Sequence, residues 1–233
     1  MSNLIYDLHT HTTFSHGKNS PRENIECAIS RGLTKIAITD HAPGHFLYGV
    51  KNLDKYFNEL YKLKEEYSKR IQVLIGLEFN IIGKESQSDY VINYKDKLDI
   101  SLIGFHKMVL PANFKSMMYF TVSKNIVKNT DIYIKLVESK MFNIITHPGY
   151  VLELDPKVFA EACVRNNVLI KINNKHNSFS VHDLEDAASR GAKFIISSDA
   201  HSSVNVGQAD CAIKTAKEAG ILSSVLNIKV SEN

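Results

Sequence analysis

KIAITDH, residues 35–41, carries a short β-branched and apolar run directly into an aspartate and a histidine. An almost continuously apolar run of this length suits a strand that is buried on both faces, as in a parallel sheet. Six other runs share this composition, so we expect seven strands, at 4–9, 35–40, 72–79, 99–105, 143–147, 168–174 and 194–199.

Capped amphipathic helices are predicted between these runs. Ser20, Pro21 and Glu23 supply an N-cap, a proline at the first helical position and a capping box. Gly32 then ends this helix. Further helices are expected at about 52–70, from Asp155-Pro156 onward, from Ser180 to Gly191, and at 206–219, whereas 108–130 is expected to hold a loop and one or two helices.

Alternation of strands and helices along the whole chain predicts an α/β fold with a parallel sheet. The sheet could be open and doubly wound, or it could close into a barrel. In a barrel, polar groups gather from many strand ends on one face, whereas an open sheet uses the crevice where the strand order reverses.

Six of the seven predicted strands end in an imidazole, a carboxylate or both. Such groups are costly to bury without a partner, and six sets of them are hard to satisfy by hydrogen bonds alone. Coordination of metal ions at the mouth of a barrel would satisfy all of them together. The spacing agrees, because residues i and i+2 of a strand share a side. Asp7, His9 and His11 are therefore expected to share one side of their strand, and Asp199 and His201 to share one side of theirs.

Nitrogen and carboxylate donors without cysteine suit Zn²⁺, Mn²⁺ or Fe²⁺, and they fit Ca²⁺ poorly. The candidate ligands number nine: His9, His11, His16, His41, Glu78, His106, His147, Asp199 and His201. This set exceeds the needs of one ion and fits two or three. Asp7 and Asp40 are expected to orient ligand imidazoles rather than to bind metal.

The chain resembles the PHP (polymerase and histidinol phosphatase) superfamily in seven motifs that follow the family's order. These are DLHTHT (7–12), TDH (39–41), GLE (76–78), GFH (104–106), THPG (146–149), INN (172–174) and SDAH (198–201). The resemblance implies a distorted (β/α)7 TIM-like barrel of parallel strands, with a trinuclear metal centre at the strand C-terminal ends. It is greatest to the small stand-alone bacterial phosphoesterases of the family.

The resemblance also implies how the ligands divide among three ions. One ion would take His9, His11, Glu78 and Asp199. A second would share Glu78 and take His106 and His147. The third would take His16, His41 and His201.

Two features depart from the family pattern. Many relatives carry a glutamate before the INN motif, and Lys171 stands there in this chain. Its amine could face the cluster and lower metal affinity, point outward, or pair with a charged substrate. Close relatives also continue past the final LN into another helix, whereas this sequence stops at VSEN, so closure of that edge is expected to be weaker or to involve a neighbouring subunit.

Clustered divalent ions lower the pKa of a bridging water and clamp phosphate oxygens, which predicts hydrolysis of a phosphate ester by metal-bound hydroxide. Asp199, His201 or the loop residue His45 could protonate the leaving group. Lys107, next to His106, is the nearest expected mouth cation, and Lys107 and His45 are the candidate substrate contacts. All five arginines fall on or beside predicted helices. A small-molecule phosphomonoesterase, with histidinol phosphate as one candidate substrate, is the favoured function. A nuclease or phosphodiesterase and a metal-binding module without catalysis are the alternatives.

The bulk composition supports an ordinary globular protein. The chain has 233 residues, 44% hydrophobic and 23% charged, with a net charge of +3 that demands neither nucleic acid nor an anionic membrane. We expect one domain over 1–233, no transmembrane helix and no signal peptide, and we leave a homo-oligomer open. Three scattered cysteines (Cys27, Cys163, Cys211) are expected to be buried free thiols, which favours the cytoplasm. His176 and His182 are expected on the surface.

Overall fold

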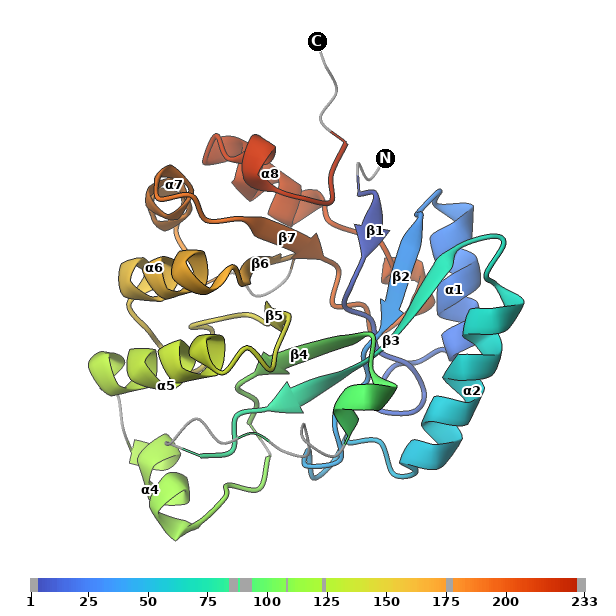
Figure 1. The fold of residues 1–233 in the computed structure, drawn as a ribbon, viewed down its shortest axis with the longest axis horizontal. Coiled ribbons are helices and arrows are strands. Elements are labelled where there is room, and N and C mark those ends of the chain that lie inside the picture. Colours follow the sequence, from blue (N-terminus) through green and yellow to red (C-terminus); the bar gives the residue numbers. More distant parts are fainter. Residues whose placement is uncertain are drawn as a thin grey trace.

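Seven parallel strands form a nearly closed barrel with helices around the outside (Figure 1). The computed structural model describes residues 4–83, 88, 94–107, 109–122, 125–174 and 178–229. The strands pair in chain order and are β1 (Tyr6–Asp7), β2 (Lys35–Ile38), β3 (Gln72–Asn80), β4 (Ile100–Gly104), β5 (Ile144–Ile145), β6 (Leu169–Asn173) and β7 (Phe194–Ser197). The barrel is therefore correct and the open doubly wound sheet is not. The strands are shorter than the apolar runs that predicted them, except β3, which ends one residue after its run.

The helices lie between successive strands, as the alternation predicts, and the last helix follows β7. They are α1 (Pro21–Ser30), α2 (Leu53–Glu66), α4 (Phe114–Val122), α5 (Ile126–Glu138), α6 (Pro156–Asn166), α7 (Val181–Ser189) and α8 (Asp210–Glu218), with short 3-10 turns η1 (Lys95–Lys97), η2 (Ser203–Asn205) and η3 (Leu222–Ser224). The capping boxes at Ser20 and Ser180 are both formed. Helix α5 extends well past 130, where no helix was predicted. The last helix begins at Asp210 rather than 206, because Gly207 adopts a left-handed φ of 73°.

The barrel closes between β1 and β7 in two different ways. Beyond the strand ends, Thr10 and Ala200 form a parallel bridge. At the opposite ends, the segment 225–228 lies between the two strands, and the buried Asn227 joins them. Its amide nitrogen donates to Tyr6 O at 2.8 Å and Ile196 O at 2.6 Å, and its Oδ1 accepts from Ile196 N at 3.0 Å. The chain covers this edge with its own segment 225–228, and the expectation of weaker closure or of a neighbouring subunit stays a prediction.

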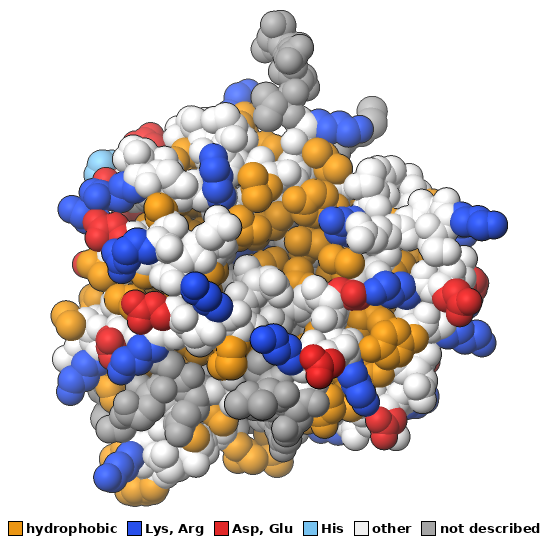
Figure 2. Space-filling model, in the orientation of Figure 1, with side chains coloured by type: hydrophobic (Ala, Val, Ile, Leu, Met, Phe, Trp, Pro, Cys, Tyr) orange, Lys and Arg blue, Asp and Glu red, His pale blue; other side chains and the backbone are white. Residues whose placement is uncertain are grey.

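Two groups of buried apolar residues hold the fold together. The larger group spans residues from Leu4 to Ile228 and packs the helices against the outside of the barrel. The smaller group fills the barrel interior with the side chains of Leu8, Ala37, Ile100, Leu102, Ile144 and Ile195. Figure 2 shows hydrophobic side chains across the middle of one face, surrounded by charged ones.

Among the described residues, no helix has both the length and the apolar character that crossing a bilayer requires.

Two of the three cysteines are less buried than expected. All three thiols are free, as predicted, and each lies on a helix. Cys163 is buried and Cys27 half-buried, but Cys211 is exposed, because it lies on the outer side of the first turn of α8.

Candidate metal centre

Hydrogen bonds from the backbone place His9 and His11 at the barrel mouth. After β1 the chain runs beside the end of β7, where His11 N donates to Ala200 O at 2.8 Å and Ala200 N donates to His9 O at 3.4 Å. Asn24 on α1 donates to His11 O at 2.9 Å. Both imidazoles are fully buried, with their Nε2 atoms 3.0 Å apart.

Asp7 and Asp40 support the backbone of the ligand-bearing segments. Asp40 accepts from Thr12 N and Thr12 Oγ1, each at 2.7 Å, and from Ser15 Oγ at 2.5 Å, which fixes the loop before His16. Asp7 accepts from Ser198 N at 3.1 Å and from Gly207 N at 2.8 Å. The role of the two carboxylates in orienting the ligand imidazoles stays a prediction. Because β1 ends at Asp7, the strand spacing from which Asp7, His9 and His11 were expected to share one side does not extend to the two histidines.

Glu78 lies at the middle of the cluster, and its two oxygens face different groups of histidines. Oε2 is 3.2 Å from His9 Nε2, 3.4 Å from His11 Nε2 and 3.3 Å from His41 Nδ1. Oε1 is 3.3 Å from His106 Nε2 and 3.5 Å from His147 Nε2. The carboxylate is therefore placed to bridge two ions.

Asp199 and the remaining histidines complete the arrangement. Asp199 Oδ1 is 3.3 Å from His11 Nε2 and 3.6 Å from His9 Nε2. A second group, His11, His16, His41 and His201, has its ligand atoms within 4.8 Å of one another. All nine candidate ligands therefore meet at one end of the barrel, although they come from six different strand ends.

Backbone geometry at the strand ends is adapted to this crowding. His147 and Asp199 have positive φ values of 29° and 55°, which non-glycine residues rarely adopt and which cluster at functional sites. Gly104 leaves room for two imidazoles. A Cβ at this position would meet Thr146 Oγ1 and would lie 2.8 Å from His147 Cε1 and 3.3 Å from His106 Cε1.

The donor atoms fit divalent transition-metal ions. Ligand atoms at Zn–N distances in a tetrahedron lie about 3.3 Å apart, close to the 3.0–3.5 Å separations around Glu78. The buried Nδ1 atoms of His11, His16 and His41 have no hydrogen-bond partner among the described residues. A histidine cluster this dense would be poorly satisfied without an ion.

Protonation also favours coordination. Burial lowers the pKa of His11 to about 3 and that of His16 to about 4, so both rings are neutral at physiological pH. Burial alone would raise the pKa of Glu78, but the neighbouring His9, His106 and His41 outweigh it and hold the pKa well below its usual value. His11, His16 and Glu78 are thus in the forms that bind metal, two neutral imidazoles and an ionised carboxylate.

A pocket of about 550 Å³ opens over the cluster. Besides the ligands, its lining contains His45, Tyr48, Phe105, Lys107, Tyr150 and Val151. Lys107 is exposed, whereas His45 is 4% exposed and accepts from Tyr48 N at 3.2 Å. Both predicted substrate residues therefore lie at the mouth, and the described lining includes no arginine.

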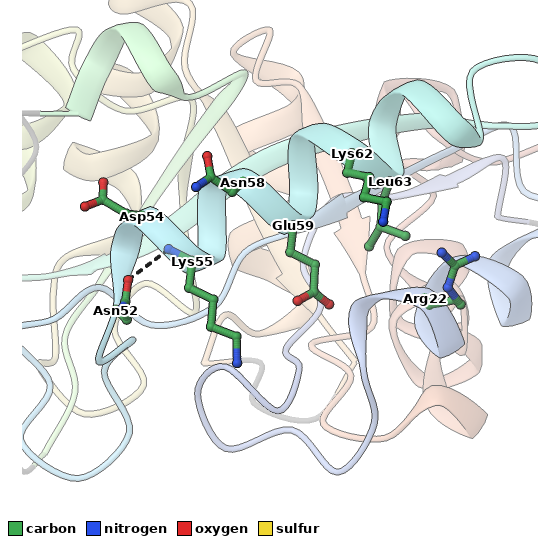
Figure 3. Close-up of a pocket in the computed structure, with 8 residues that line it drawn as sticks. All are labelled: Arg22, Asn52, Asp54, Lys55, Asn58, Glu59, Lys62 and Leu63. Carbon is green, nitrogen blue, oxygen red and sulfur yellow. Dashed lines mark hydrogen bonds between the residues drawn. The ribbon is translucent and has the colours of Figure 1, made fainter.

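A second hollow of about 650 Å³ lies along the outer surface of α2 (Figure 3). Its lining comes from α2, its N-cap Asn52 and Arg22 of α1, and Asn52 Oδ1 accepts from Lys55 N at 2.8 Å. Arg22 is paired with Glu66 at 2.5 Å. No candidate metal group among the described residues falls in this hollow.

Four supporting residues were missed or left open by the sequence. Thr146 Oγ1 donates to Glu78 Oε1 at 2.8 Å, and Asn173 Nδ2 donates to Asp199 Oδ2 at 2.9 Å. Asn80 Oδ1 lies 2.8 Å from His106 Nδ1. Thr146 and Asn173 lie inside quoted motifs and Asn80 lies two residues after Glu78, so position in or near a motif was the available signal. Lys171 faces the cluster and is 2% exposed.

His182 is exposed as expected, and His176 lies outside the described residues.

Comparison with known proteins identifies the family. A family model described as the PHP domain matches residues 7–199. The chain belongs to the PHP family. A PHP relative named "Probable phosphatase" from Thermoanaerobacter sp. (strain X514) is 31% identical over 242 residues, covering 98% of this chain and 92% of that protein. Another protein of that name, from Shewanella frigidimarina, is 28% identical and covers 93% and 86%.

The PHP barrel is also similar to a crystal structure of histidinol phosphate phosphatase from Lactococcus lactis, solved with zinc, L-histidinol and phosphate. The TM-score is 0.70, with 20% identity over 97% of each chain. At this identity the likeness concerns the fold, and it confirms the distorted TIM-like barrel expected of a PHP protein.

Proposed function

We propose that this PHP protein is a metal-dependent phosphoesterase that hydrolyses a small phosphate monoester. The observation that carries the proposal is the convergence of seven histidines on Glu78 and Asp199 at the base of a 550 Å³ pocket. The PHP relatives named as phosphatases support the reaction class.

The ligand assignment follows the three groups given above. His9, His11, Glu78 and Asp199 would hold one ion, Glu78, His106 and His147 a second, and His16, His41 and His201 a third. Two or three Zn²⁺, Mn²⁺ or Fe²⁺ ions suit these donors. Such ions supply Lewis acidity, which lowers the pKa of coordinated water and offsets charge on the phosphate.

The chain's own residues would orient the substrate. Lys107 is placed to attract a phosphate at the mouth, and Tyr48 stacks on His16 with ring centroids 4.4 Å apart. Burial lowers the pKa of His45 to about 4, so this ring is neutral at physiological pH and suits substrate contact better than proton donation. Asp199 and His201 remain the proposed catalytic groups, with His201 Nδ1 lying 2.9 Å from Asp199 O.

The pocket favours a small molecule over a nucleic acid. Lys107 is the single lysine of the described lining, and backbone-tracking grooves are usually rich in positive charge. Histidinol phosphate is the first substrate to test, given the Lactococcus lactis structure with histidinol and phosphate. The acidic groups of the described lining are the candidate ligands Glu78 and Asp199, so an amine-bearing substrate would have to share them.

The test combines metal analysis with a substrate panel. Purified protein with measured metal content should hydrolyse phosphate monoesters, histidinol phosphate among them, and lose this activity on chelation. Cleavage of oligonucleotides in place of monoesters would favour the nuclease alternative. Metal-replete protein that hydrolyses neither would contradict both.

We also propose that residues 1–233 form one domain. A single cluster of buried apolar residues runs from Leu4 to Ile228 and supports this organisation. The cytoplasmic setting predicted from the three free thiols stays a prediction.

A further inference from the structure

A buried lysine lies among the candidate ligands. On β6, Leu169 packs against the apolar cluster of the barrel interior, and Asn173 donates to Asp199. Lys171 lies two residues from each of them, so its side chain points to the same interior side. It is 2% exposed, and its Nζ lies within hydrogen-bonding distance of His9 Nδ1.

The ring of His9 is therefore held differently from the others. Its Nε2 faces Glu78 and Asp199, at 3.2 and 3.6 Å, as a ligand atom would. A neutral imidazole that coordinates through Nε2 carries its proton on Nδ1, and this N–H normally donates to a carboxylate or carbonyl. His106 meets that requirement with Asn80 Oδ1, and His201 with Asp199 O. His9 instead meets an amine.

An amine is a poor partner for this nitrogen in either of its forms. An ammonium group has three donors and no acceptor, so it can bond to Nδ1 only if the proton sits on Nε2, which removes the ligating lone pair. A neutral amine can accept from Nδ1 but lacks the negative charge that makes the ring a stronger ligand. Any positive charge on Lys171 also opposes a cation between Asp199 and Glu78, the carboxylates it interacts with.

We propose that Lys171 is a positioning residue that makes the metal position bounded by His9, His11, Glu78 and Asp199 the weakest of the centre. The protein would hold the other ions firmly and exchange this one readily. This inference rests on the metal-dependent function proposed above. It adds that the protein binds the ion at this position from solution, so that occupancy of the position depends on the free metal concentration around the protein.

The experiment measures Zn²⁺ stoichiometry and affinity of the chelator-stripped full chain by competition with a chromophoric chelator. Wild-type protein should show tight binding with one weaker equivalent. K171Q and K171E place an acceptor beside His9 Nδ1 and should bind that equivalent about 10–100-fold more tightly, the usual size of such partner effects. K171R, which keeps a charged donor and no acceptor, should leave it as weak as in the wild type.

The control is K193Q, which removes the same charge from an exposed lysine next to β7 and should not change Zn²⁺ affinity. If K171E does not fold next to Glu78 and Asp199, the neutral K171Q still decides the question. Equal affinity for every ion in the wild type, or no gain in K171Q, would overturn the role of Lys171 while leaving the phosphoesterase proposal intact. Absence of any Zn²⁺ binding would overturn the proposed function itself.

Discussion

The two ends of the barrel interior are filled in opposite ways by the same strands. At one end, Leu8, Ala37, Ile100, Leu102, Ile144 and Ile195 form a small apolar plug. At the other, nine imidazoles and carboxylates crowd together around Glu78, whose oxygens lie 3.2 Å from His9 Nε2 and 3.3 Å from His106 Nε2. On β3, Leu74 packs against the plug and Glu78, four residues later, centres the polar cluster. The plug contributes stability, and the polar end carries the chemistry.

Substitution of Glu78 should give the largest effect, at the polar end. Glu78→Gln keeps the shape but removes the charge that both groups of histidines face, so metal retention should fall and kcat/KM should drop by about 10³-fold, or about 4 kcal/mol. Metal analysis and monoester hydrolysis measure both. Glu65→Gln on the exposed side of α2 is the matched control. Full activity and full metal content in Glu78→Gln would refute its bridging role.

Truncation of the plug should produce the complementary result. Leu102→Ala leaves a cavity in the barrel interior, and the free energy of unfolding should fall by about 3 kcal/mol. The kcat of the folded variant should stay within a few-fold of wild type. Urea unfolding and hydrolysis at saturating substrate test this separation, with the exposed Leu110→Ala as control. A loss of kcat as large as that of Glu78→Gln would show that the two ends are not independent.

A substitution in the seam between β1 and β7 should have the next largest effect. Asn227→Ala removes three hydrogen bonds and leaves buried backbone groups of Tyr6 and Ile196 without this partner, which should cost about 2 kcal/mol of unfolding free energy. Thermal unfolding compares this variant with the exposed Asn58→Ala. An unchanged melting temperature would mean that segment 225–228 does not hold the barrel closed.

The pH dependence of the metal-free protein should show the smallest effect. His11 and His16 have folded pKa values of about 3 and 4, below the usual 6.5, because they are buried. The unfolded chain therefore binds more protons than the folded one between pH 6.5 and 4, and stability should fall as the pH falls through this window. His16→Gln should make the decline shallower, and the exposed His182→Gln should not. A flat profile in wild-type protein would contradict neutral histidines at the polar end.

Sequence patterns predicted the polar end better than the seam. Apolar runs that end in polar residues identified the strands, and strand-end position brought most of the candidate ligands together. His16 lies in a loop beyond the strand, and its prediction depended on the family resemblance. The part of helix α5 beyond residue 130 was missed because IVKNTDIYIKLVE is rich in β-branched residues, which weaken the helical signal. Segment 225–228 has no periodic pattern, and its role depends on contacts with residues more than 200 positions away.

That separation has a consequence for the order of folding. Ile5 N donates to Asn227 O, and Leu4 bridges to Ile228, so the seam joins the first and last described segments. Contacts between distant residues require the longest loop closure, and chains dominated by them fold slowly. The same seam brings His9 and His11 beside Asp199. We therefore expect the barrel wall to form first and the ligand set to be completed last, so that metal capture coincides with the final closure of the chain.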